Sequence, residues 1–448
     1  MRTVTLTTIL TLALAACGGG QSGSGSASLE AVAKFRATPP LSLAAQVGQK
    51  IFFDKSLSGS DKMSCATCHD PNHAYGPPND LAVQPGGNDL TMPGLRAVPS
   101  LRYKEYTPAY ADLLDNPDGI SVPGPGGGFT WDGRANTLAE QAGIPLLSAF
   151  EMANGSAADV VAKLRAGAYA KLFRQAFGDD VFSNTATAFK DASAALQAFQ
   201  LEDSSFHPYS SKFDLYAGNK IGGALTLAEA RGLALFSNPK IGNCSSCHYQ
   251  GAGLNGSSAL FTDFSYEAIG VPRNAGVRAN ADSSYVDMGV CGPLRNDHSP
   301  ASPAAPDVHC GKFGTPTLRN VATRKVFFHN GVIHSLEQAI RFYNTRDTNP
   351  EIWYPTVGGT PRASADPSFP TYGLVTTQYD GGTVQKFDDL PAAYHSNIDP
   401  QMPLDGRAAG STPPMTEQNI ADLVCFLGTL TDGYKPPAAP PTGGPCVN

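Results

Sequence analysis

The residue types with the most specific spacing in this chain are two pairs of cysteines, each followed directly by a histidine. Residues 65–69 and residues 244–248 both read C-x-x-C-H. This spacing places two thiols on one turn, where they can form thioethers to the two vinyl groups of a haem, and the histidine can bind the iron. The two motifs therefore predict two c-type haems, attached and ligated by Cys65, Cys68, His69, Cys244, Cys247 and His248.

Two other structures could use the same residues, namely a pair of disulfides or a zinc site. A Cys2His2 zinc site would require the two cysteine pairs to converge in space. Neither alternative explains why both motifs share the x-x spacing and the histidine that follows. The pattern favours haem.

Length and composition limit the classes of function. A chain of 448 residues is long enough for two domains with their own cores, and its 41% hydrophobic content is ordinary for a globular protein. The formal charge of -7 and the lack of a basic run argue against a nucleic-acid partner. The 47 glycines and 36 prolines predict a large share of loop.

The first 28 residues are typical of an export signal followed by a linker. Arg2 supplies a positive charge, residues 6–14 are apolar, and residues 14–17 read Leu-Ala-Ala-Cys, which indicates a lipobox with Cys17 as the acylated residue. The alternative is an ordinary signal peptide cut near Ala16. The sequence predicts a periplasmic protein with a lipid anchor at Cys17, and Gly18 resembles the sorting signal of outer-membrane lipoproteins. No later stretch is long and apolar enough to span a bilayer.

Four cysteines remain after the lipid and haem assignments, and an exported chain can oxidise them. Three pairings are possible, and the sequence does not choose among them. The pairs nearest in sequence would be Cys291–Cys310 and Cys425–Cys446.

The haem motifs need helices to position them. Residues 29–54 are predicted to be helical, with Val47, Ile51 and Phe52 on one face. Residues 48–52 and 232–236 both read Gly-x-x-(Ile/Leu)-Phe, and each precedes one haem motif. This repeat predicts an internal duplication and a mainly α fold of two cytochrome-c-like helical domains, each with one haem.

The predicted domain boundaries follow from this duplication. Residues 29–214 form the N-terminal haem domain, 215–435 the C-terminal haem domain and 436–448 a tail. Further helices are predicted within 156–177, 185–201, 226–236 and 416–430, with Thr226, Glu229 and Thr416 as capping residues. Long irregular stretches are predicted at 70–129, 282–312 and 350–410.

Residues 129–152 carry the segment that points beyond simple electron transfer. Taken alone, they read as a tryptophan on a tight Asp-Gly turn, a short helix from Thr137 and a glutamate. The segment resembles the W-D-G-R-A-x-x-L-x-x-Q-x-x-x-P…E-M stretch of bacterial di-haem cytochrome c peroxidases and the related MauG proteins. Residues 52–58 and 316–331 resemble the same family, and the matches together cover most of residues 44–430.

The resemblance implies roles for four residues around the N-terminal haem, which is the peroxidatic one in that family. Glu151 matches the distal acid–base carboxylate, which can move both protons of the peroxide reaction if burial raises its pKa. Gln141 would hydrogen-bond the bound oxygen, and Pro145 would limit access. Trp131 matches the aromatic residue between the two haems.

The chain departs from the peroxidase branch at the distal ligand of the first haem. That branch carries a displaceable histidine after the first motif, whereas here His73 is only four residues past His69 and the rest of the loop to Phe129 has no histidine. Met92 is a weak substitute. We therefore expect an open distal side, as in MauG.

Tyr343 falls where the peroxidases place an axial methionine on the second haem and where MauG-like proteins place tyrosine. A phenolate is a hard anion that favours ferric and higher iron states, whereas a thioether favours ferrous iron. The alternative is Tyr343 as a helix-face aromatic, with Met402 or Met415 as the ligand.

These features predict a MauG-like di-haem enzyme that reacts with hydrogen peroxide and draws electrons from a protein partner oxidised on a side chain. Two alternatives stay open. One is a cytochrome c peroxidase that removes peroxide with electrons from a small cytochrome or cupredoxin, and the other is a non-catalytic electron-transfer cytochrome. The resemblance also admits a calcium ion, since family members often hold one between their domains.

Overall fold

The computed structural model describes residues 39–117, 122–253, 257–298, 307–363, 366–439 and 443–447. The chain divides into residues 1–40 and residues 41–448, and all elements below belong to the second unit. The predicted lipid anchor at Cys17 lies outside the described residues. No helix in the described ranges has both the length and the apolar character needed to cross a membrane.

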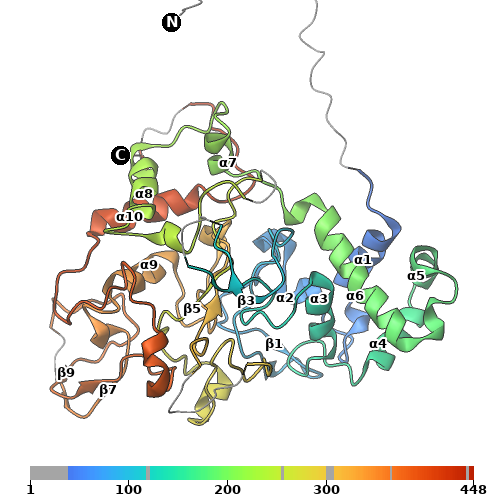
Figure 1. The fold of residues 1–448 in the computed structure, drawn as a ribbon, viewed down its shortest axis with the longest axis horizontal. Helices are drawn as coiled ribbons and strands as arrows, with labels where there is room; N and C mark the ends of the chain where they lie inside the picture. The colour runs from blue at the N-terminus through green and yellow to red at the C-terminus, as the bar shows by residue number, and fades with distance from the viewer. Residues whose placement is uncertain are drawn as a thin grey trace, which may run out of the picture. The chain divides into compact units, whose positions relative to one another are not determined.

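The first motif follows α1 (Leu43–Phe53), which belongs to a group of helices that packs around one hydrophobic core. The other helices of the group are α3 (Leu138–Leu147), α4 (Ala157–Ala166), α5 (Ala170–Phe177) and α6 (Thr185–Glu202), with α1 and α6 side by side (Figure 1). The prediction of a helix from residue 29 is wrong for residues 39–42, which are not helical. Proline has no N–H and disfavours helix in the residue before it, so Pro39 and Pro40 delay the start until Ser42 caps α1.

The second motif follows a helix of another group. This group contains α7 (Lys212–Ala217), α8 (Leu227–Phe236), α9 (Leu336–Thr345) and α10 (Glu417–Gly428) around a second core. The predicted capping box of α8 is confirmed, because the Thr226 side chain accepts from the Glu229 N–H and Glu229 accepts from the Thr226 N–H. Thr416 caps α10, also as predicted.

The helices that precede the two motifs, α1 and α8, each need a glycine for the same structural reason. A Cβ added to Gly48 would lie 1.9 Å from the carbonyl oxygen of Ala195 in α6, and one added to Gly232 would lie 2.1 Å from that of Asp422 in α10. Only glycine allows these two helix pairs to approach so closely. The duplicated sequence therefore marks a duplicated helix crossing before each C-x-x-C-H motif.

The described parts of the long stretches predicted as irregular are mostly loop. Short strands within and beside these stretches pair in antiparallel fashion. The first of these pairs join β1 (Pro85–Gly86) to β2 (Met92–Pro93), β3 (Ala111–Leu114) to β4 (Gly124–Gly126) and β5 (Tyr266–Glu267) to β6 (Phe313–Gly314). Two more join β7 (Thr356–Val357) to β10 (Thr383–Val384) and β8 (Thr360–Pro361) to β9 (Tyr379–Asp380). The described fold is mainly helical with little strand. The domain boundaries at residues 28, 214 and 435 stay predictions.

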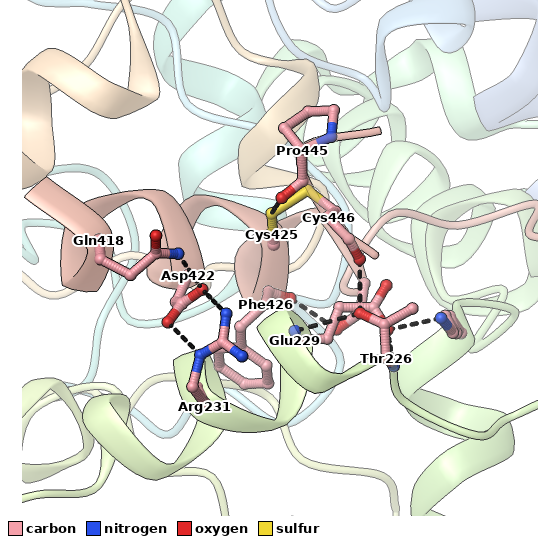
Figure 2. Close-up of a disulfide and its surroundings, with 11 residues drawn as sticks. Thr226, Glu229, Arg231, Gln418, Asp422, Cys425, Phe426, Pro445 and Cys446 are labelled. Carbon is pink, nitrogen blue, oxygen red and sulfur yellow. Dashed lines mark hydrogen bonds and ion pairs between the residues drawn. A yellow bond between two sulfur atoms is a disulfide. The ribbon is translucent and has the colours of Figure 1, made fainter. Parts of the chain in front are cut away.

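The structure selects the disulfide pairing that the sequence left open, namely Cys291–Cys310 and Cys425–Cys446. Figure 2 shows the second bond, which ties α10 to the C-terminal segment. The Thr226 hydroxyl donates to the Cys446 carbonyl, and Arg231 of α8 binds Asp422 of α10 at 2.7 Å. The tail and the two helices are thus joined by a covalent bond, a hydrogen bond and an ion pair.

Candidate active site

The site residues predicted from the first motif and from residues 129–152 all line one cavity, which we call the first cavity. It has about 2380 Å³ of empty space, including a part open to solvent. The predicted residues that line it are Cys65, Cys68, His69, Trp131, Gln141, Pro145 and Glu151. Residues far apart in sequence therefore share one cavity.

The second cavity does the same for the second motif. It has about 1950 Å³ of empty space by the same measure and is lined by Cys244, Cys247, His248 and Tyr343. Met402 also lines this cavity, so Tyr343 and Met402 both remain candidate iron ligands. Met415 is packed in the second core and its backbone binds Asn344, and it is not among the described residues that line the cavity.

The two motif histidines are prepared to bind a metal through one defined nitrogen. Nδ1 of His69 lies 3.0 Å from the carbonyl oxygen of Tyr75, and Nδ1 of His248 lies 3.1 Å from that of Phe261. Burial lowers the pKa of each imidazole to about 4, so both are neutral near pH 7. A neutral ring whose Nδ1–H donates to a carbonyl keeps its Nε2 lone pair for iron.

The motif cysteines form neither of the alternative structures. None of the four is in a disulfide, and burial raises the pKa of Cys65, Cys68 and Cys244 to about 12. Among the described residues, the groups able to hold a metal ion do not include either motif, which disfavours the zinc reading. The short helix α2 (Cys65–Cys68) begins with a capping box between Ser64 and Thr67, which fixes the thiols on one turn.

Two half-buried cations support haem as the occupant of the cavities. Lys104 lines both cavities and Arg324 lines the second. Burial lowers the pKa of Lys104 to about 8, with a further contribution from the charge of Arg324, and lowers the pKa of Arg324 to about 10. Buried cations need a nearby anion, and the propionates of haem would supply it. Sequence reasoning missed both residues, because neither belongs to a motif.

Trp131 lines both cavities and is held by its neighbours. Its indole N–H donates to the Ala97 carbonyl at 2.8 Å. The next residue, Asp132, is fully buried and accepts from Arg96 and Arg134, each at 2.8 Å. Burial opposes ionisation of Asp132, but the charges of Arg96 and Arg134 outweigh it and hold the pKa of this carboxyl below its usual range.

Helix α3 and the turn after it place the three predicted distal residues. Gln141 and Pro145 are four residues apart in α3 and so lie on one face of the helix. Glu151 follows in a turn in which its N–H donates to the Ser148 carbonyl at 3.0 Å. Burial raises the pKa of the Glu151 carboxyl, although a hydrogen bond with Ser148 and the charge of Arg134 oppose the shift.

The structure separates the alternative distal ligands from the first cavity. Met92 is 42% exposed and does not line it. His73 hydrogen-bonds Asp70 at 2.8 Å and lines the second cavity instead. Of the described residues that line the first cavity, His69 is the one histidine, while Met63 and Met152 supply its thioethers.

Comparison with known proteins gives one consistent result. A family model described as di-haem cytochrome c peroxidase matches residues 42–221. The methylamine utilization protein MauG of Paracoccus denitrificans is 35% identical over 318 residues, which is 69% of this chain and 76% of that protein. Cytochrome c551 peroxidase of Nitrosomonas europaea is 29% identical over 312 residues, covering 68% and 73%.

A solved structure extends the similarity over nearly the whole chain. The crystal structure of the diheme peroxidase BthA from Burkholderia thailandensis superposes with a TM-score of 0.72 at 36% sequence identity. The superposition covers 89% of this chain and 88% of that one.

Proposed function

Since this chain belongs to the di-haem cytochrome c peroxidase family and is an oxidoreductase that reacts with hydrogen peroxide, we propose that peroxide reacts in the first cavity and that electrons arrive through the second. One observation carries the proposal. Trp131 lines both cavities, while Glu151, a half-buried carboxyl whose pKa is raised by desolvation, lines the first. These positions would allow Glu151 to transfer protons in the first cavity and Trp131 to carry electrons between the two cavities.

Each cavity is proposed to hold one c-type haem, bonded to the two motif thiols and ligated by Nε2 of the motif histidine. The haems would supply redox-active iron at both sites. Their binding residues are the six cysteines and histidines of the two motifs, and Lys104 and Arg324 would neutralise the propionates. The calcium ion admitted by the sequence stays a prediction.

The residues of the first cavity are proposed to control protons and access. Glu151 would accept a proton from peroxide and return it to the leaving oxygen, and a pKa raised by burial suits both steps near neutral pH. Gln141 would orient the peroxide by hydrogen bonding, and Pro145 would narrow the approach. In the second cavity, Tyr343 is proposed as the distal ligand, with Met402 as the alternative.

We propose a MauG-like electron source, which is a protein partner oxidised on a side chain. Two features favour it over the peroxidase alternative, namely the absence of histidine other than His69 among the described residues lining the first cavity, and the position of Tyr343. The amino-terminal sequence supports a periplasmic location with a lipid anchor at Cys17. Metabolic labelling with a radioactive fatty acid, compared with a Cys17→Ser variant, tests the anchor.

One experiment separates the three functions. Hydrogen peroxide is added to the purified haem-loaded protein, either fully ferric or half-reduced, and the absorption spectrum is followed by stopped flow. Reaction of the ferric protein without a reductant supports the MauG-like function. Reaction only after half-reduction, with turnover of a reduced cytochrome, supports the peroxidase function, and no reaction in either state leaves an electron carrier.

A further inference from the structure

Away from both cavities, two histidines and an aspartate from distant parts of the chain come together. They are Asp112 of β3, His298 and His309, and their potential ligand atoms all lie within 4.8 Å of one another. Nε2 of His298 is 3.1 Å from Oδ1 of Asp112, and the rings of His298 and His309 are 5.5 Å apart between centroids. We propose that these three residues bind a divalent transition-metal ion of the zinc type.

The distances suit one shared ion. Zinc binds imidazole nitrogen and carboxylate oxygen at about 2.0–2.2 Å, so two tetrahedral ligands of one ion lie about 3.3 Å apart. The Asp112–His298 pair already has nearly this separation. Since the whole set lies within 4.8 Å, rotation of side chains is enough to bring the third ligand to the same distance.

A histidine that binds a metal usually has a hydrogen-bond partner at its other ring nitrogen, and His309 has such a partner. Its Nδ1 lies 3.1 Å from Oδ1 of Asp307, which orients the ring and leaves Nε2 as the nitrogen for a metal. The backbone around it is held firmly, because Cys310 is joined to Cys291 and the Asn397 side chain donates to the carbonyls of Asp307 and Cys310. The ligand is thus positioned before any ion arrives.

Local charge also favours a cation. Asp112, Asp297 and Asp307 contribute three negative charges around the two imidazoles. A nearby cation, Arg295, has its charge balanced by Asp297 at 2.6 Å, and its guanidinium lies 3.8 Å from the Tyr110 ring centroid. Two carboxylates, those of Asp112 and Asp307, are left to compensate a divalent ion.

The ligand types indicate which ions fit. Two imidazoles and a carboxylate suit zinc, copper(II) and nickel(II), whereas calcium and magnesium prefer sites made of oxygen alone. A bound ion would connect β3 to His298 and His309, which lie in sequence between the disulfide-bonded Cys291 and Cys310. The segment 291–298 also reaches the first cavity, because Leu294 lines it and Arg295 donates to the Asp132 carbonyl at 2.8 Å.

The test is zinc binding to the haem-loaded protein, produced without a histidine tag and freed of metal by dialysis against a chelator. Isothermal titration calorimetry with zinc chloride gives affinity, and elemental analysis after dialysis gives stoichiometry. We expect one zinc ion per chain in addition to the two irons. His298→Gln and His309→Gln should each weaken binding at least about tenfold, and Asp307→Asn by about 10–100-fold, as for other metal-orienting partners.

Two further variants make the result decisive. Asp112→Asn changes an exposed ligand on a strand and tests the site even if a histidine variant fails to fold. His334→Gln removes an exposed histidine outside the cluster and should leave binding unchanged. Absence of zinc binding in the wild-type protein, or equal binding in the wild-type protein and all three ligand variants, overturns the proposal.

Discussion

The buried carboxylate of Asp132 binds the guanidinium of Arg96, with 2.8 Å between Oδ2 and Nη1. Arg96 also binds Asp287 at 2.6 Å, so one cation joins the loop before β3 to a segment near the second cavity. Because Asp132 directly follows Trp131, this ion-pair network fixes the indole between the two cavities. A fixed position is what an electron bridge requires, since electron transfer depends steeply on distance.

Replacing Trp131 by Phe tests the bridge. Phenylalanine fills much of the same space but is harder to oxidise and cannot donate to the Ala97 carbonyl. After addition of peroxide, we expect spectral changes at the first haem to persist and changes at the second haem to be slowed. Stopped-flow absorption and freeze-quench electron paramagnetic resonance measure both. Trp353→Phe, the other tryptophan, lies in the second core and is the control; equal rates in the two variants would remove Trp131 from the pathway.

Replacing Glu151 by Gln tests the acid–base group. We expect the reaction with peroxide to slow by about 10²–10⁴-fold, the usual contribution of a positioned proton-transfer group. Because burial raises the pKa of Glu151, the wild-type rate should fall on acidification at a pH above the ordinary value of about 4.3, and the variant should lose this pH dependence. Glu140→Gln changes an exposed glutamate of α3, the helix before Glu151, and should leave the rate unaltered.

We expect the carboxyl of Glu151 to support activity, but its ionised form to lower the stability of the folded protein at neutral pH. A raised pKa in the folded protein means that folding favours the protonated form, so Glu151 contributes stability at low pH that is lost as pH rises through its folded pKa. Glu151→Gln should therefore raise the thermal midpoint at neutral pH while it lowers activity. A lower midpoint in the glutamine variant would show that the carboxylate is stabilised by its surroundings.

The features that could be predicted from the sequence are those determined by local residue spacing or by the repeated helix crossing. The C-x-x-C-H motifs, the capping boxes and the position of Glu151 beside the first motif all depend on residues close in sequence or on a recognised segment. Lys104 and Arg324 could not be predicted, because their importance comes from burial beside a cavity. The Asp112–His298–His309 cluster could not be predicted for a similar reason, since only the packing of distant segments brings its members together. The helix prediction is wrong at residues 39–42, where Pro39 and Pro40 oppose helix despite the apolar spacing that follows.

Glu267 should make the potential of the second haem depend on pH. Glu267 lines the second cavity, and burial raises its pKa to about 7, partly offset by the charge of Lys312. Deprotonation between about pH 6 and 8 adds negative charge to the cavity wall and favours ferric iron, so the potential should fall as pH rises, by up to about 59 mV per unit. Spectroelectrochemical titration measures this slope. Glu267→Gln should flatten it, while Glu337→Gln, an exposed control, should not.

Replacing Tyr343 by Phe tests the distal ligand of the second haem. If the phenolate binds the iron, the low-spin electron paramagnetic resonance signal should change in Tyr343→Phe and persist in Met402→Leu. Burial raises the pKa of Tyr343 above its usual value, so the phenol loses its proton only if the iron stabilises the phenolate. The reverse pattern, with a change in the methionine variant alone, would assign the thioether of Met402 and would predict a higher potential.

Replacing Gly232 by Ala tests the duplicated helix crossing. An added Cβ would lie 2.1 Å from the Asp422 carbonyl oxygen and must push α8 away from α10, so we expect the free energy of unfolding to fall by about 1–3 kcal/mol or more. Gly48→Ala should act in the same way on α1 and α6. Gly428→Ala is the matched control, because this helical glycine has no atom within 4 Å of the added Cβ and alanine there should stabilise by about 0.5–1 kcal/mol. Chemical denaturation of the haem-loaded variants gives all three values, and a stabilised Gly232→Ala would show that the two helices can separate without cost.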